Sequence, residues 1–149
     1  LMSTLVQTIK DAVKDAMRAK DKPRLGALRL ITAEFKRVEV DERVEVSDER
    51  ALAILDKMVK QRRDSIAQYQ QAGRDELAQA EQQEIDIISE FLPEALSEEE
   101  LAKLVADAVA QSGAAGMQDM GKVMGILKPQ VQGRADIAQV SQLVKSQLG

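Results

Sequence analysis

The sequence predicts an all-α protein, with an N-terminal bundle of about four helices followed by a smaller C-terminal unit of three helices. Aromatic residues make up only 2% of the 149 residues, whereas β-sheets are enriched in aromatic and β-branched side chains. Apolar residues recur at steps of three and four, in stretches separated by capping residues, glycines and prolines. We therefore expect two helical domains, residues 1–93 and 97–149, with the boundary between Leu92 and Leu96.

The first two helices are predicted from a cap, a break and two apolar stripes. Ser3 suits the N-cap of a helix from about Thr4 to Lys20. Residues 21–23 interrupt the pattern, and Pro23 suits the first turn of a second helix. The stripes consist of Leu5, Ile9, Val13 (or Ala12) and Met17 in the first helix, and of Leu25, Leu28, Ile31, Phe35 and Val38 in the second. Residues 39–46 are charged and lack helical periodicity, so we predict a loop there.

The next two helices are predicted to form a hairpin. Ser47 is followed by two acids, which favour the start of a long helix that runs to about Ala72. Gly73 is a typical C-terminal stop, and a fourth helix is expected from about Asp75 to Phe91, ended by Pro93.

The C-terminal unit begins with a capping box. Ser97 and Glu100 have the spacing of this motif and predict a helix over 98–111, with Leu101, Leu104, Val105, Ala108 and Val109 facing inward. Gly113 and Gly116 end it. A short helix over about 119–127 is expected to stop before Pro129, and Gly133 and Asp136 precede a last helix over 137–148, whose apolar set is Ile137, Val140, Leu143 or Val144, and Leu148.

Missing residue types exclude several kinds of chemistry. The chain has no Cys and no His, which excludes disulfides, Cys/His zinc sites, thiol nucleophiles and catalytic triads with a histidine base. It has no apolar run long enough for a membrane span, and LMSTLVQTIKDAVKD lacks the pattern of a secretory signal. We therefore expect a soluble, cytoplasmic protein with no cofactor, no metal ion and no membrane partner.

Charge is unevenly distributed along the chain, although the net charge is only −4. Residues 1–63 contain 15 Lys or Arg and 11 Asp or Glu, whereas residues 64–100 contain one Arg and 11 acids. Residues 101–149 contain five bases and three acids. This pattern indicates different surfaces for different partners, pairing between segments, or simply solvated helix faces of alternating sign.

Charged residues interrupt the apolar stripes of the third and fourth helices. Arg62 lies within the stripe of Leu52, Leu55, Val59, Ile66 and Tyr69, and both Glu81 and Glu84 lie within the stripe of Leu77, Ile88 and Leu92. Because a buried charge is costly unless it is paired, we predict a structural ion pair between Arg62 and Glu84 or Glu81. A general acid/base pair, or a Mg²⁺ or Ca²⁺ site built of oxygens, is the alternative for the two acids. Ser65 has no visible base, so no catalytic residue is assigned.

The segment MGKVMGILKPQVQGRAD, residues 120–136, combines glycines with cations. Gly121 and Gly125 lie four residues apart, with Lys122, Lys128 and Arg134 around them. Free backbone N–H groups and cations suit phosphate, whereas small residues at this spacing also suit close packing of helices. The segment is not a P-loop, because the Gly-Lys-Ser/Thr pattern is absent.

Several motifs carry a family resemblance. RRDS, AGR, the spaced glutamates, FLPE and the acidic capping run occur within residues 61–101, and the Gly-Lys-Val-Met and Gly-Arg-Ala-Asp pieces follow in order within residues 120–148. With these motifs, essentially the whole chain resembles the GatB/YqeY family, specifically its free-standing YqeY-like proteins. The resemblance implies a helical N-terminal bundle joined to a smaller helical C-terminal unit.

The resemblance also implies kinship with the tail domain of the B subunit of aminoacyl-tRNA amidotransferase, which helps to hold tRNA. In this chain, the resemblance implies that the following residues face tRNA: Gly121, Lys122, Lys128, Gly133 and Arg134. It therefore suggests a tRNA-associated accessory or binding protein whose partners are tRNA, an amidotransferase or other translation proteins, and not DNA.

Two alternative functions follow from the same sequence. The family implies carbon–nitrogen ligase activity with glutamine as amido-N-donor, in which this chain is a component of a larger complex. The chain lacks the B subunit's catalytic cradle and the amidase partner, so we expect no catalysis by this chain alone. The second alternative is a helical protein–protein adaptor whose acidic segment, residues 64–100, docks a basic partner.

Overall fold

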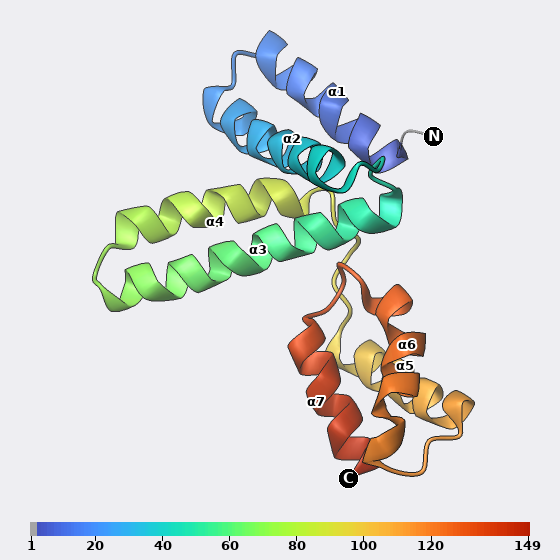
Figure 1. Ribbon diagram of the computed structural model, residues 1–149. Coiled ribbons are helices and arrows are strands. Elements are labelled where there is room, and N and C mark those ends of the chain that lie inside the picture. Colours follow the sequence, from blue (N-terminus) through green and yellow to red (C-terminus); the bar gives the residue numbers. More distant parts are fainter. Residues whose placement is uncertain (1–2) are drawn as a thin grey trace. The chain divides into compact units, whose positions relative to one another are not determined.

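The computed structural model describes residues 3–149, and within them it contains seven α-helices, one 3₁₀ turn and no strand (Figure 1). The all-α class predicted from the sequence is confirmed. The chain divides into two compact units, one ending at Leu92 and the other comprising Pro93–Gly149. No helix among the described residues has both the length and the apolar character needed to cross a bilayer.

The first unit consists of two helical hairpins. The helices are α1 (Thr4–Arg18), α2 (Lys22–Glu42), α3 (Asp48–Gln71) and α4 (Asp75–Ser89). Figure 1 shows α1 beside α2 and α3 beside α4, and α2 also contacts both α3 and α4. Two predictions for α3 are confirmed. The helix begins after its Ser47 cap, and it ends before Gly73, whose φ is 69°.

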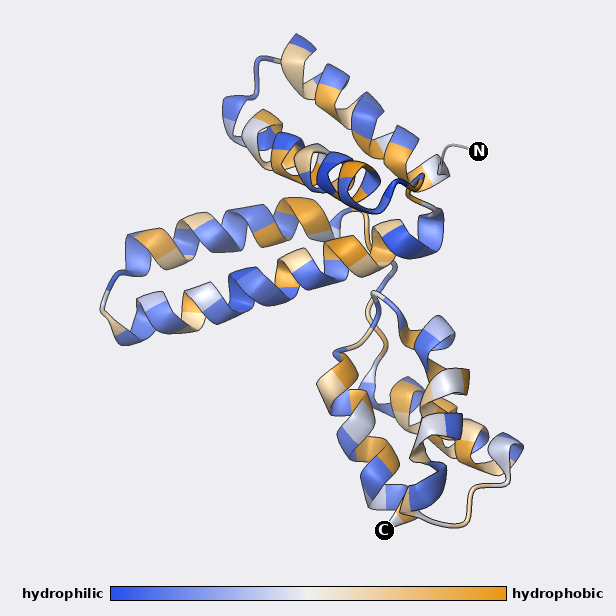
Figure 2. Ribbon diagram, in the orientation of Figure 1, coloured by the Kyte–Doolittle hydropathy of each residue, from blue (hydrophilic) through white to orange (hydrophobic). Residues whose placement is uncertain are grey.

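The core of this unit lies where the two hairpins meet. α3 contributes Ala51, Ile54, Leu55, Met58 and Val59, α2 contributes Leu28, Ile31, Phe35 and Val38, and α1 and α4 add Val6, Ile9, Ala16, Ile85 and Ile88. Figure 2 shows that the α3–α4 hairpin is apolar near this core and mostly hydrophilic toward its turn. The far half of the hairpin therefore depends on contacts between its own two helices.

Two apolar residues that the stripes placed inside are exposed. Met17 of α1 is 51% exposed and Leu77 of α4 is 37% exposed, while their neighbours Ala16 and Ala78 are buried. The rest of each stripe is placed as expected, since Ile9 and Ile88 are buried, so only the end of α1 and the start of α4 differ from the expected face. Closely packed helices favour alanine at the contact, so the larger side chain lies at the edge.

The loop predicted over residues 39–46 is partly wrong, because α2 continues to Glu42. Two ion pairs support this last turn: Arg37 binds Asp41 at 3.2 Å, and Arg50 of α3 binds Glu42 at 2.6 Å. Arg43 then ends the helix with φ 55°, and buried Val46 leads into α3. Asp41 and Glu42, which interrupt the apolar pattern in the sequence, thus stabilise the last turn of α2 by forming ion pairs.

A polar contact joins the start of α1 to the start of α3. The Ser3 hydroxyl accepts a hydrogen bond from the Val6 N–H and donates one to the Asp48 carboxylate, which also accepts the Leu5 N–H at 2.9 Å. These hydrogen bonds hold the pKa of Asp48 below its ordinary value of 3.8, the Ser3 hydroxyl having the largest effect. The carboxylate of α3 therefore satisfies an orphan N–H group at the N-terminus of α1.

The second unit is a smaller bundle of α5 (Glu98–Ser112), α6 (Met120–Val131) and α7 (Ile137–Leu148), with a 3₁₀ turn at Met117–Asp119. All three helices contact one another. The predicted capping box is present: the Ser97 hydroxyl accepts the Glu100 N–H at 3.1 Å, and the Glu100 carboxylate accepts the Ser97 N–H at 3.2 Å. The core is formed by Leu101, Val105, Ala108, Val123, Met124, Leu127, Val131, Val140 and Val144.

The predicted stop of α6 before Pro129 is wrong. The helix continues through Pro129 to Val131, and the Gln132 N–H donates to the Lys128 carbonyl at 3.0 Å. A proline removes only its own N–H from the hydrogen-bond ladder. Buried Leu127 and Val131 lie on the same side of the helix, one turn apart, so packing of this face offsets the missing hydrogen bond.

We predict that Asp48→Asn lowers the thermal unfolding midpoint at neutral pH. Because folding lowers the pKa of Asp48, its carboxylate stabilises the fold above the ordinary carboxyl pKa, and this contribution is lost as pH falls through the lowered value. The difference between wild type and variant, followed by circular dichroism, should therefore shrink in acid. Glu49→Gln, an adjacent first-turn acid, is the control. A difference that stays constant with pH would contradict this role.

Candidate functional site

The charged residues within the α3–α4 hairpin form one well-defined ion pair. Arg62 Nε donates to Glu84 Oε2 at 2.7 Å, and Arg62 Nη1 donates to the Met58 carbonyl at 3.1 Å. The side chains are 14% and 33% exposed, respectively. Glu81 is half-buried and forms no ion pair among residues 3–149. Of the two acids expected for Arg62, the structure thus selects Glu84, and the guanidinium also satisfies a backbone carbonyl.

The alternatives of a metal site or an acid/base pair at this hairpin find no support in the side chains around it. Within residues 3–149 no three His, Cys, Asp or Glu side chains cluster closely enough to hold a metal ion. The Ser65 hydroxyl donates to the Gln61 carbonyl one turn earlier at 3.1 Å, a common arrangement for serine inside a helix.

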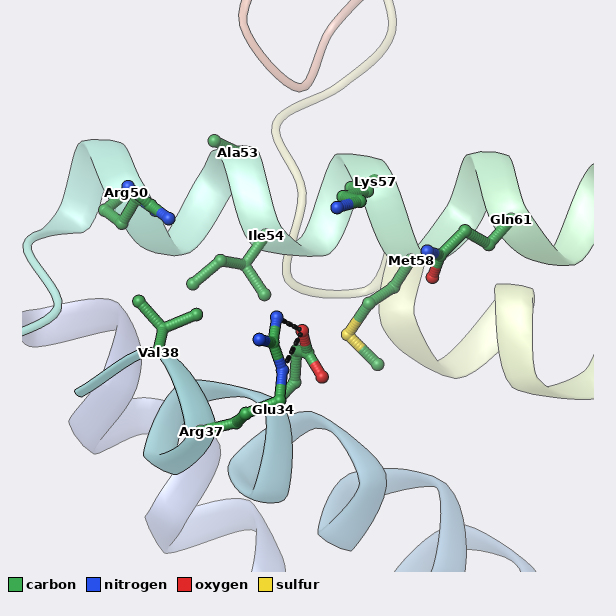
Figure 3. A pocket seen from close by; sticks show the side chains of 9 residues that line it. All are labelled: Glu34, Arg37, Val38, Arg50, Ala53, Ile54, Lys57, Met58 and Gln61. Atoms are coloured by element: carbon green, nitrogen blue, oxygen red, sulfur yellow. Dashed lines mark hydrogen bonds and ion pairs between the residues drawn. The ribbon is translucent and has the colours of Figure 1, made fainter. Parts of the chain in front are cut away.

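A depression of about 260 Å³ between α2 and α3 contains several charged side chains (Figure 3). Val38, Ile54 and Met58 form its apolar lining. The Arg37 guanidinium lies against the Glu34 carboxylate, as the dashed lines in Figure 3 mark, and lowers the pKa of Glu34. Arg37 also pairs with Asp41, and Arg50 with Glu42. Two of the three cations that line this depression, Arg37 and Arg50, are therefore neutralised within the protein, and Lys57 is the third.

The two glycines of α6 lie on an open surface. Gly121 and Gly125 are exposed, and a Cβ atom added to either would meet no neighbouring atom within 4 Å. The interpretation that these glycines permit close helix packing is therefore wrong for the described chain. At about 100° per residue, the exposed lysines Lys122 and Lys128 flank the glycine face on its two sides.

Lys122 remains free to meet a ligand. Its side chain is 73% exposed, and its Nζ lies 3.9 Å from Asp119 Oδ1, the outer limit of an ion pair. An exposed pair at this distance contributes little stability, so a phosphate could replace the carboxylate at small cost.

The other two tRNA-facing candidates have a structural role. Gly133 is buried with φ 73°, a left-handed conformation that favours glycine. Arg134 is half-buried: its Nε donates to the Glu94 carbonyl at 3.2 Å, and its own carbonyl accepts the Leu96 N–H at 2.9 Å. Arg134 thus holds residues 94–96 against the turn between α6 and α7.

The sequence did not single out a further cationic surface between α1 and α2. Lys10, Arg29 and Lys36 line one depression there, together with Thr32, Ala33, Phe35 and Glu39. The seven-residue spacing of Arg29 and Lys36 places both on one helix face and is the signal that could have indicated it. The contribution of Lys10 depends on how α1 pairs with α2.

Comparison with known proteins gives a consistent result. The family model described as "Yqey-like protein" matches residues 6–148. A protein of Pyrenophora tritici-repentis named "Altered inheritance of mitochondria protein 41, mitochondrial" is 29% identical over 140 residues, covering 92% of this chain and 77% of that protein.

Proteins of the same name in two other organisms match over shorter stretches. The Eremothecium gossypii protein is 40% identical over 99 residues, covering 64% of this chain and 54% of its own length. The Clavispora lusitaniae protein is 38% identical over 103 residues, covering 67% and 60%. The chain thus spans little more than half of these two relatives.

The relatives' names contradict the expected cytoplasmic location, since they describe mitochondrial proteins. The physical reason for the error is that composition and helix patterning determine folding, whereas a compartment is specified by separate targeting signals.

We predict that Arg62→Met destabilises the first unit by about 1–3 kcal/mol, because it leaves the Glu84 carboxylate without its partner. The expected loss of stability is smaller than for a fully buried pair, because the Glu84 side chain is 33% exposed and water can solvate its carboxylate. Urea unfolding should show partial recovery in Arg62→Met/Glu84→Gln. The exposed neighbour Arg63→Met should be nearly neutral. Additive losses in the double variant would show that the pair does not couple.

The glycines of the second unit should respond oppositely to alanine. Gly125→Ala should stabilise the full chain by about 0.5–1 kcal/mol, because the position is helical and open. Gly133→Ala should destabilise it by about 1–2 kcal/mol, because alanine is strained at positive φ. Urea denaturation measures both, and loss of stability in Gly125→Ala would restore the packing interpretation.

Proposed function

The chain belongs to the family of Yqey-like proteins, and from this premise we propose that it is a tRNA-associated accessory protein that contacts RNA phosphates through α6. The observation that carries the proposal is the open face of Gly121 and Gly125 between Lys122 and Lys128. This arrangement lies within the segment whose motifs resemble the tRNA-holding tail of the amidotransferase B subunit.

The geometry of α6 supports contact with a phosphodiester strand. Glycine leaves the helix backbone uncovered, so a bulky strand can approach it closely. The lysines on either side supply mobile point charges, which bind phosphate without demanding a fixed orientation. We leave Arg134 out of this surface, because its side chain is half-buried and its Nε already donates to the Glu94 carbonyl.

The proposed interaction is dominated by phosphates rather than by bases. Sequence-specific RNA recognition usually stacks bases on aromatic rings, and this chain has no Trp, one Tyr and two Phe. Phe35 is buried, and Tyr69 and Phe91 are half-buried. We therefore expect salt-sensitive binding that distinguishes RNAs by shape more than by sequence.

Reversing both lysines, in Lys122→Glu/Lys128→Glu, should weaken binding of labelled tRNA by about tenfold or more at low salt. The slope of log affinity against log salt should fall by about 1.5, since each lost phosphate contact removes roughly one released counterion. Fluorescence anisotropy over a series of KCl concentrations measures both values. Mitochondrial tRNA belongs in the test, because the relatives are named as mitochondrial proteins.

The matched control is Lys103→Glu/Lys145→Glu, which changes the same net charge at exposed positions of α5 and α7. The control should retain most of the affinity. If wild type fails to bind tRNA at low salt, or both double variants weaken binding equally, the proposed role of the α6 face is wrong.

A further inference from the structure

The surface between α1 and α2 holds three cations around one depression of about 500 Å³. Lys10 comes from α1, and Arg29 and Lys36 come from α2. A smaller depression of about 200 Å³, lined by Val6, Val44, Glu45 and Val46, shares Lys10 and Glu39 with it. The two depressions therefore form one continuous groove along the hairpin.

The three cations of this groove have no partner within the described chain. No ion pair or side-chain hydrogen bond of Lys10, Arg29 or Lys36 occurs among residues 3–149. The depression between α2 and α3 differs in this respect, because Arg37 and Arg50 are already paired there with three carboxylates. An anion entering the α1–α2 groove would gain charge interactions without displacing internal ones.

The lining of the groove favours phosphates over an acidic protein segment. Protein interfaces depend on aromatic or large aliphatic anchors that fill apolar pockets. Around the three cations the groove offers Thr32 and Ala33, while the Phe35 side chain is buried in the core. In the smaller depression Val6 and Val46 are also buried, which leaves Val44 as its one exposed apolar side chain. A phosphate backbone requires cations and access rather than an apolar anchor.

The position of the cations favours a strand over a single phosphate group. Arg29 and Lys36 lie two turns apart, about 10 Å along α2. Both stand in the helix interior, where every backbone N–H is already used, so no cradle of N–H donors exists for one isolated phosphate. Separated single charges instead match successive phosphates of one chain.

We infer that the α1–α2 groove, through Lys10, Arg29 and Lys36, is a second contact surface for the RNA phosphodiester backbone. This inference rests on the proposed function but concerns a different unit of the chain from the α6 face. Two acids line the groove: Glu39 belongs to both depressions, and Glu45 belongs to the smaller one, whereas the three cations surround the larger one. Glu39 is therefore the acid nearest to the cations. Its carboxylate opposes a phosphate there, so its neutralisation should strengthen binding.

The test compares two triple variants of equal charge change, with labelled tRNA as the probe and the full chain as the protein. Lys10→Gln/Arg29→Gln/Lys36→Gln removes the groove cations. Lys57→Gln/Lys60→Gln/Arg63→Gln removes three exposed cations of α3 outside the groove and is the control. Glu39→Gln is a third variant, and it is expected to raise the affinity for tRNA, whereas the groove variant lowers it. Circular dichroism melts establish that all variants are folded.

The groove variant should bind tRNA about tenfold more weakly at low salt and show a salt slope reduced by about 2, whereas the control should stay near wild type. Glu39→Gln should bind more tightly. Equal loss in the two triple variants would overturn the inference, because net charge alone would then explain it. The inference would also be overturned if the groove variant bound tRNA as tightly as wild type while Lys122→Glu/Lys128→Glu bound it more weakly. The proposed function would then still stand.

Inorganic phosphate provides the remaining arm of the test. Amide shifts around Arg29 and Lys36, followed by NMR, should respond to tRNA and only weakly to inorganic phosphate. Saturable binding of inorganic phosphate at the groove, with no response to tRNA, would replace the strand with a small phosphate ligand. If wild type binds no tRNA at low salt, the proposed function fails, and the strand assignment fails with it.

Discussion

The first unit depends on how α3 buries its apolar side. The first half of this 24-residue helix supplies Leu55, Met58 and neighbouring core residues to all three other helices, so the two hairpins share one core. Beyond that core α3 pairs with α4, and its inward side changes from buried apolar residues to Arg62 followed by the half-buried Ile66 and Tyr69. Arg62 stands at this transition, where pairing with Glu84 and the Met58 carbonyl replaces apolar contact. The hairpin can therefore extend from the core without leaving a charge unpaired.

Features set by neighbouring residues could be predicted from the sequence. The caps at Ser3, Ser47 and Ser97 were found because a side-chain oxygen satisfies N–H groups two or three residues away. Features set by packing could not. Whether Met17 or Ala16 faces inward at the end of α1, and whether α6 passes through Pro129, depend on surfaces supplied by distant parts of the chain.

The candidate site shows the same division. The partner of Arg62 could be narrowed to two acids, because charges within an apolar stripe must be paired. The commitment of Arg134 could not be predicted, since it depends on a contact with Glu94, 40 residues earlier. The open surface at Gly121 could not be predicted either, because the sequence does not distinguish a glycine that faces another helix from one that faces solvent. The cationic groove required the pairing of α1 with α2.

A chain with net charge −4 can contact a polyanion only through local surfaces, because charges more than about 10 Å apart are largely screened at moderate salt. The acids concentrate in residues 64–100, whereas Lys10, Arg29 and Lys36 lie on α1 and α2, and Lys122 and Lys128 on α6. Such separation keeps the cations available but limits each surface to a few phosphate contacts. If both proposed surfaces contact one RNA, their combined affinity exceeds that of either alone, and the spacing of phosphates in the folded RNA then contributes to selectivity.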